Sequence, residues 1–233
     1  KDKHNESKTH KTLGTIYEIL GDQHNAIIAY ENAISCAIEV KDKNLESNAY
    51  NPLSGIFLKQ GNINKALDII ELSVSIKKET GDNRGYAFAI YGRGKVYTHL
   101  ERYEEARHDF EEALAIHESV GDQFAIAMCH NKMAQLFIKT GERDKAKICL
   151  KIALDISDSN NLSLMKNKCY YFMYSIYKEE GDHVIALEYL EKYLKEKDAT
   201  INSQTLKVIE NYERISKIQS KENKAKLRRQ KAE

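Results

Sequence analysis

The apolar residues of the chain recur at helical spacing. In segments such as YLEKYL and FEEALAI they fall at i, i+3, i+4 and i+7, which places them on one face of a helix. Gly-Asp pairs at 21–22, 81–82, 121–122 and 181–182 separate these segments. Glycine suits the left-handed end of one helix, and aspartate suits the cap of the next. With a single proline in 233 residues, the pattern predicts an all-α chain of long helices joined by short turns.

These helices repeat with a period of 40 residues. Alanine and an aromatic residue each recur five times at this interval, at Ala26, Ala66, Ala106, Ala146 and Ala186, and at Tyr17, Phe57, Tyr97, Phe137 and Tyr177. Glycine keeps the same step at positions 21, 61, 141 and 181, and Glu101 replaces it in the third copy. Each unit is expected to be a pair of helices that cross closely at the alanine. We predict five units, at about 6–40, 46–80, 86–120, 126–160 and 166–197.

The order of these residues resembles the tetratricopeptide repeat (TPR) in a 40-residue form. The first copy shows it as Leu13, Gly14, Tyr17, Gly21, Ala26, Tyr30 and Ala33, and the third as Gly94, Tyr97, Ala106, Phe110 and Ala113. Arg93 and Tyr174 depart from the motif. The resemblance implies a right-handed superhelical solenoid of five antiparallel helix pairs over residues 1–197. It also implies that the first helix of each pair lines a concave groove that binds a partner's peptide.

The stretch Gly92-Arg93-Gly94-Lys95 has the composition of a phosphate-binding loop. It lacks the GxxxxGK[ST] spacing, however, and follows no predicted strand. Gly94 shares its register with Gly14, Ser54 and Ala134, all of them small. We therefore expect this stretch to lie in mid-helix, with Gly94 serving the packing of two helices.

The inner positions that the TPR resemblance assigns are mildly basic, with five lysines against one glutamate. The candidate partner-binding residues are Lys11, Asn48, Asn51, Tyr91, Lys95, Asn131, Gln135, Lys168, Tyr171 and Lys178. Asparagine and glutamine can bond a peptide backbone, and tyrosine offers flat contact area. The alternative is that they are ordinary solvated residues. As a set they favour an acidic peptide or protein segment as the partner.

We expect no catalytic residues, no metal site and no cofactor. His99, His108 and His117 are nine residues apart, which puts successive members on opposite sides of a helix, and no HExxH motif occurs. The cysteines contain no CxxC pair, so we expect buried free thiols in a reducing cytoplasm at Cys36, Cys129, Cys149 and Cys169. An enzyme acting on phosphoproteins is an alternative that no residue supports.

After Lys195 the 40-residue pattern stops, and residues 214–233 hold eight Lys and Arg against two Glu, a charge of +6 where the rest of the chain carries −5. A short heptad-like seam precedes this tail at Ile201, Thr205, Val208, Tyr212, Ile215 and Gln219. We predict that residues 198–233 form a C-terminal helix that caps the solenoid and continues as a basic, coiled-coil-like linker able to form a homodimer. Because no aromatic residues are interleaved with the basic ones, a nucleic acid is not the expected partner.

No apolar run reaches the length of a membrane span, and the opening KDKHNESK has neither a Met nor an apolar signal region. We therefore expect a cytoplasmic protein and a sequence cut from a longer one. The stretch after the repeats resembles junctions in bacterial signalling proteins, where a TPR region leads into a histidine kinase, a nucleotide cyclase or a DNA-binding module. This implies a non-catalytic interaction and regulatory module of a larger signal-transduction protein. The alternative is a free-standing TPR adaptor or scaffold.

Overall fold

The chain is entirely helical over residues 2–230, whose backbone the computed structural model describes. Side chains are described for residues 2–198, 207, 208, 210, 211, 214–218, 220, 221 and 224. The helices are α1 (Lys3–Ile19), α2 (Gln23–Glu39), α3 (Lys43–Lys59), α4 (Ile63–Glu79), α5 (Asn83–His99), α6 (Tyr103–Ser119), α7 (Gln123–Lys139), α8 (Arg143–Ser159), α9 (Ser163–Glu180) and α10 (His183–Gln230). The predicted all-α class is confirmed.

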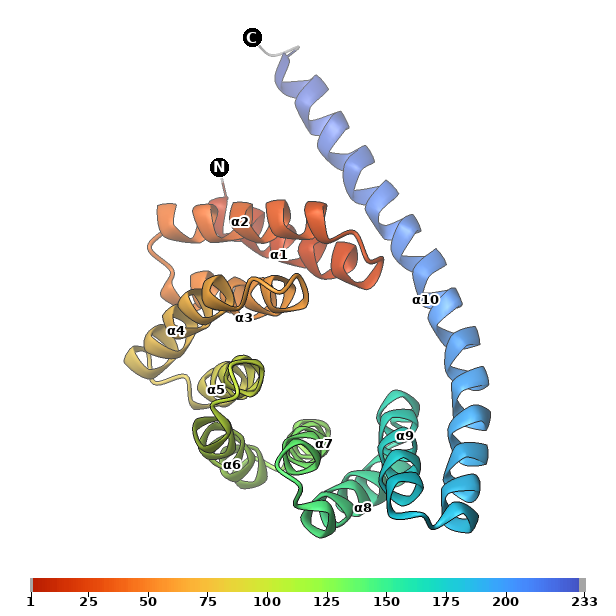
Figure 1. Cartoon of the computed structure of the whole chain (residues 1–233). Coiled ribbons are helices and arrows are strands. Elements are labelled where there is room, and N and C mark those ends of the chain that lie inside the picture. The colour runs from red at the N-terminus through yellow and green to blue at the C-terminus, as the bar shows by residue number, and fades with distance from the viewer. Residues whose placement is uncertain (1, 231–233) are drawn as a thin grey trace.

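Consecutive helices form five antiparallel pairs, which stack side by side into a curved solenoid (Figure 1). The odd-numbered helices lie on the inner side of the curve and α2, α4, α6 and α8 on the outer side. Each inner helix also packs against the inner helix of the next pair, whereas no two outer helices pack together among the described residues. Closer packing of the inner layer makes the stack concave on the side of α1, α3, α5, α7 and α9.

Glycine and aspartate shape the turns as the sequence predicts. Gly21 has a left-handed φ of 78°, and the side chain of Asp22 accepts a hydrogen bond from the backbone N–H of Asn25 at the start of α2. Glu101, which replaces the periodic glycine, keeps the left-handed backbone at φ 59°. That conformation costs a residue with a side chain roughly 1–2 kcal/mol. The turn geometry is therefore set by the packing of the helices as well as by the local sequence.

The recurrent alanines are all buried, in keeping with the close crossing predicted for the two helices of each pair. They are fully buried in the first four pairs and 3% exposed in the fifth, at Ala26, Ala66, Ala106, Ala146 and Ala186. The stretch 92–95 lies inside α5, as expected. A Cβ atom added to Gly94 would lie 2.7 Å from Cε1 of Phe110, so a close helix contact accounts for this glycine.

The C-terminal helix differs in extent from the one predicted to begin near residue 198. It is the continuation of the second helix of the fifth pair, because no glycine or proline follows Gly181 to end it. Helix α10 pairs with α9 and then crosses the open side of the solenoid towards α1 (Figure 1). There Ile215, 7% exposed, joins a small apolar cluster with Leu13, Ile16 and Ala29.

The predicted dimerisation seam thus contributes Ile215 to a contact within the chain. Val208 is partly buried. The other seam side chains lie outside the described residues, namely Ile201, Thr205, Tyr212 and Gln219.

Candidate peptide-binding groove

On the concave side of the inner helices, here called the groove, two partly buried lysines are affected by the charges of lysines on other inner helices. The four lysines concerned lie on four inner helices. They are Lys59 on α3, Lys95 on α5, Lys132 on α7 and Lys168 on α9. Burial lowers the pKa of Lys95, the positive charges of Lys59 and Lys168 lower it further, and Glu18 acts in the opposite direction. Since α5 and α9 do not pack against each other in the described part of the chain, Lys168 acts on Lys95 across the groove.

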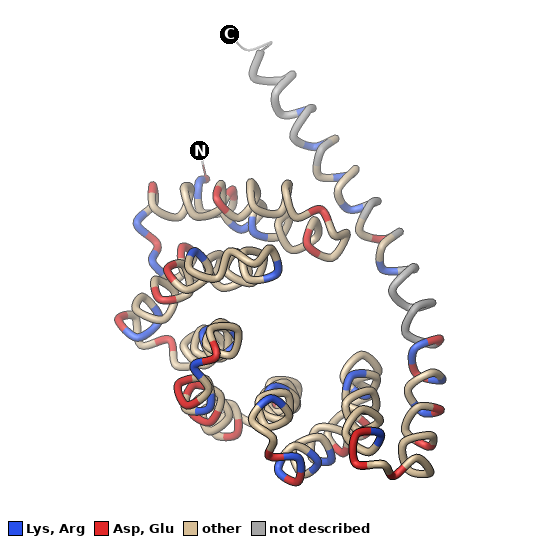
Figure 2. The backbone as a smooth tube through the Cα atoms, viewed as in Figure 1, with Lys and Arg blue, Asp and Glu red and all other residues tan. Residues whose placement is uncertain are grey.

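The ammonium group of Lys132 is perturbed in the same direction as that of Lys95. Burial, together with the smaller effects of the positive charges of Lys95 and Lys168, lowers the pKa of Lys132 to about 8. It is still mainly protonated at pH 7. Figure 2 shows that the inner helices α7 and α9 carry basic residues along their backbone. Lys95 and Lys132 are partly buried, whereas Lys168 is exposed and Lys59 is exposed and pairs with Glu18 at 2.7 Å. An anion bound beside Lys95 and Lys132 would relieve the repulsion of their poorly solvated charges.

A chain of side-chain amides holds Lys132 in place. Its Nζ donates to Oε1 of Gln135 at 2.9 Å, and Nε2 of Gln135 donates to Oδ1 of Asn131 at 2.7 Å. Asn131, only 3% exposed, donates in turn to Sγ of Cys169 on α9 at 3.3 Å. These contacts link α7 to α9 and orient the ammonium group before any partner arrives.

The other two predicted asparagines also hold helices together. Nδ2 of Asn51 donates to the backbone oxygen of Phe88 at 3.0 Å, which joins α3 to α5. Oδ1 of Asn48 accepts a 2.8 Å hydrogen bond from Nζ of Lys77, a nearly buried lysine on α4. Asn48 therefore joins the two helices of one repeat and Asn51 joins two neighbouring repeats, with part of each side chain left exposed.

The two predicted tyrosines have different surroundings. Tyr91 is 9% exposed and packs against Phe110, with 5.8 Å between the ring centroids. Tyr171 is 46% exposed and contacts the rings of Tyr174 and Tyr193. Tyr171 therefore offers a flat aromatic surface at the α9 end of the groove. Only a small part of the Tyr91 side chain is exposed in the middle of the groove.

The remaining predicted lysines lie near the two ends of the groove. Lys11 is exposed on α1. Lys178 is exposed at the end of α9, with its Nζ 5.6 Å from the centroid of the Tyr174 ring. Neither belongs to the central group formed by Lys95, Lys132 and Lys168.

Sequence reasoning missed Lys59 and Lys132. Lys132 follows Met128 by four residues and precedes Gln135 by three, so it lies on the face already assigned to the groove. The set of inner positions predicted for each first helix did not include this register. The 40-residue repeat does not mark this position either, because the other repeats have unrelated residues there. They are Thr12, Pro52, Gly92 and Phe172.

Known proteins resemble the chain in sequence motifs and in fold. Residues 12–36 and 86–159 each match a family model described as a tetratricopeptide repeat. No curated protein sequence matches the chain significantly. Neither matched family is a catalytic one, and no helix among the described residues is long and apolar enough to cross a membrane.

The chain also resembles several solved structures at low sequence identity. BtubC (BKLC) from P. vanneervenii matches with a TM-score of 0.67 at 21% identity, over 83% of this chain and 80% of its own. The apo form of RapI matches with a TM-score of 0.64 at 13% identity, over 87% and 86%. A Rap protein complexed with competence and sporulation factor has a TM-score of 0.66 at 13% identity, over 88% and 66%. Residues 12–36 and 86–159 thus match the tetratricopeptide repeat, a repeat that generally serves protein–protein interaction, and the five stacked helix pairs share the fold of these solved structures.

Proposed function

We propose that this chain is a non-catalytic interaction module that binds an acidic peptide or protein segment in its groove. The observation that carries the proposal is the pair of partly buried lysines Lys95 and Lys132 on neighbouring inner helices, whose pKa values are lowered by burial and by the charge of Lys168. A carboxylate bound among them would replace repulsion with charge-assisted hydrogen bonds. Such bonds contribute about 1.5–3 kcal/mol each where water is partly excluded.

Two further features support a groove that receives a protein segment. The amides of Asn131 and Gln135 already hold Lys132 in place, which reduces the entropy lost on binding. The exposed ring of Tyr171 extends the surface along α9. Among the structural neighbours, a Rap protein is complexed with competence and sporulation factor, so a related solenoid does occur with a bound factor.

The proposal is tested by fluorescence anisotropy with a labelled oligoglutamate peptide, and with an oligolysine peptide as the charge control. We expect only the acidic peptide to bind, with an affinity that falls as salt is added. Lys95→Gln and Lys132→Gln should each weaken binding by about tenfold. The matched controls Lys78→Gln and Lys151→Gln, exposed on the outer helices α4 and α8, should bind as the wild type does. Equal affinity for all four variants would show that the groove is not the binding site.

We further propose that the module is the regulatory part of a larger bacterial signalling protein in the cytoplasm. Helix α10 supports this, because it leaves the solenoid as one long helix able to carry a rotation or a register shift to an output domain.

The four cysteines are free and buried, in keeping with a reducing compartment. The alternative is a free-standing adaptor. An intact mass in the source cells well above 26.8 kDa favours the first, and a mass close to it favours the second.

A further inference from the structure

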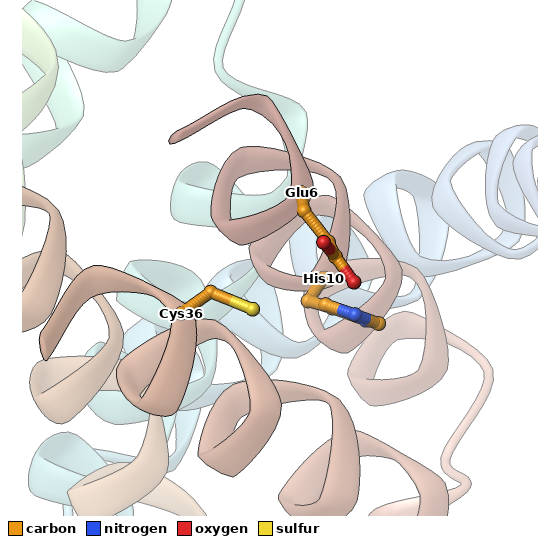
Figure 3. A group of neighbouring side chains, drawn as sticks. All are labelled: Glu6, His10 and Cys36. Atoms are coloured by element: carbon orange, nitrogen blue, oxygen red, sulfur yellow. The ribbon is translucent and has the colours of Figure 1, made fainter. Parts of the chain in front are cut away.

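The first repeat contains a group of metal-ligand side chains on a face that the groove does not use. Glu6 and His10 lie one turn apart on α1, and Cys36 on α2 points its sulfur towards them (Figure 3). Their ligand atoms all lie within 4.8 Å of one another. We propose that Glu6, His10 and Cys36 bind a zinc ion that ties α1 to α2.

The three donors suit zinc in type and number. Thiolate, imidazole and carboxylate are the ligands that zinc takes in proteins, usually in a tetrahedral arrangement. Three protein ligands leave the fourth position to water, which the partly exposed His10 and Glu6 make accessible. Cys36, 5% exposed, lies beneath them. Its thiol releases its proton to solvent when the sulfur coordinates the ion.

Comparison with the other repeats shows how unusual this combination is within the chain. The position of Cys36 is isoleucine in the next three repeats, at Ile76, Ile116 and Ile156. The position of His10 is occupied by Tyr50, Ile90, His130 and Tyr170. No other repeat combines a carboxylate, an imidazole and a thiol at these three registers. The contact between the two helices of a repeat is mainly apolar at these registers in the rest of the solenoid. In the first repeat it contains three possible metal ligands instead.

The same donors already attract a cation. Nζ of Lys3 lies 3.9 Å from Sγ of Cys36, 3.5 Å from a carboxylate oxygen of Glu6 and 3.3 Å from one of Glu39. The Lys3 side chain is on the first turn of α1 and 27% exposed, so it can turn away while keeping its partner Glu39. An arriving zinc ion would take the place of this ammonium group beside Cys36 and Glu6.

Calorimetric titration of the full chain with Zn²⁺ tests the site, and Co²⁺ serves as a spectroscopic probe. We expect one ion per chain and, with cobalt, a thiolate-to-metal charge-transfer band. Glu6→Gln, His10→Ala and Cys36→Val should each weaken zinc binding by at least about tenfold, and the last should abolish the band. Cys149→Ser and His99→Ala, which change the same residue types elsewhere, should bind as the wild type does.

Lys3→Ala leaves all three ligands in place and should change the zinc affinity in the opposite direction. Because it removes the competing ammonium group, it should tighten zinc binding by several-fold. Zinc should also raise the Tm of the wild type, through binding to the folded state alone, and leave that of Cys36→Val unchanged. If zinc fails to bind one to one, if the ligand variants bind it as the wild type does, or if Lys3→Ala weakens binding, the proposal is wrong. Since the readouts use no peptide, they are independent of the groove.

Discussion

Gly94 and Phe110 show how single residues fit the two helices of a repeat together. The ring of Phe110 occupies the space that a Cβ on residue 94 would need, and Tyr30 does the same opposite Gly14 at 2.7 Å. At the equivalent pairs an aliphatic side chain faces a small residue that has a Cβ, as in Ser54 with Ile70 and Ala134 with Leu150. The size of the residue on the second helix thus decides how small the residue on the first must be.

Gly94→Ala should therefore destabilise the protein by roughly 1–3 kcal/mol through overpacking, although alanine is the better helix former. Gly55→Ala is the matched control, since Gly55 also lies within an inner helix but has no atom within 4 Å of an added Cβ. That variant should gain up to about 1 kcal/mol from helix propensity. Urea unfolding gives the free energy of unfolding of both variants. Equal shifts in the same direction would show that the close contact with Phe110 is not the cause.

At the scale of helices, α4, α5 and α6 are joined by one network of charges. Nε and Nη2 of Arg93 donate to the two carboxylate oxygens of Asp109 at 2.8 and 2.7 Å, and Nη1 lies 3.2 Å from Glu71. Asp109 is 1% exposed, so the guanidinium group supplies the compensation that its burial requires. This explains why arginine stands where the TPR motif usually has leucine.

Asp109→Ala should cost about 3–5 kcal/mol, because it leaves the guanidinium of Arg93 partly buried without its bidentate partner. Adding Arg93→Leu, which restores the usual residue of the motif, should recover part of the loss. Glu105→Ala breaks an exposed ion pair with Arg102 and should leave the stability close to that of the wild type. The three stabilities come from urea unfolding. A double variant less stable than Asp109→Ala alone would contradict this explanation.

The 40-residue periodicity was sufficient to predict the helix pairs. The capping residues explain why the first helices start earlier than predicted. The first helices begin about three residues before the predicted 6, 46 and 86, because the aspartates at 2, 42 and 82 cap them. The ion pair of Arg93 with Asp109 could not be predicted, since an aspartate on a helix rich in charge looks like a solvated residue. The lysine group was missed for a related reason, because Lys132 has no counterpart at its register and Lys59 has only Lys139.

At the scale of the whole molecule, α10 joins the last repeat to the first. Ile215 packs against Leu13 and Ile16 of α1, and Ile218 lies beside them. The sequence could not predict this contact, because a short apolar seam looks the same whether it meets α1 or a second copy of the chain. Dimerisation through α10 stays a prediction, and the contact with α1 would compete with it for Ile215.

Ile215→Glu should release the far part of α10 from α1, since a carboxylate cannot remain buried in that apolar cluster. The radius of gyration measured by small-angle X-ray scattering should increase as a result. Ser216→Glu places the same charge one residue further on, at an exposed position, and should leave the radius unchanged. An unchanged radius for Ile215→Glu would show that the contact does not hold α10 in place in solution.

The central claim is that the groove holds crowded ammonium groups that an acidic segment would neutralise. NMR titration of Lys132 in the free chain and with bound oligoglutamate tests it most directly. We predict a pKa of about 8 in the free chain, below the ordinary 10.5. The unfolded chain then binds more protons between these values, so stability should rise with pH across that window. Bound carboxylates favour the charged form and should raise the pKa of Lys132. An ordinary pKa in the free chain, or one that the peptide leaves unchanged, would contradict the account.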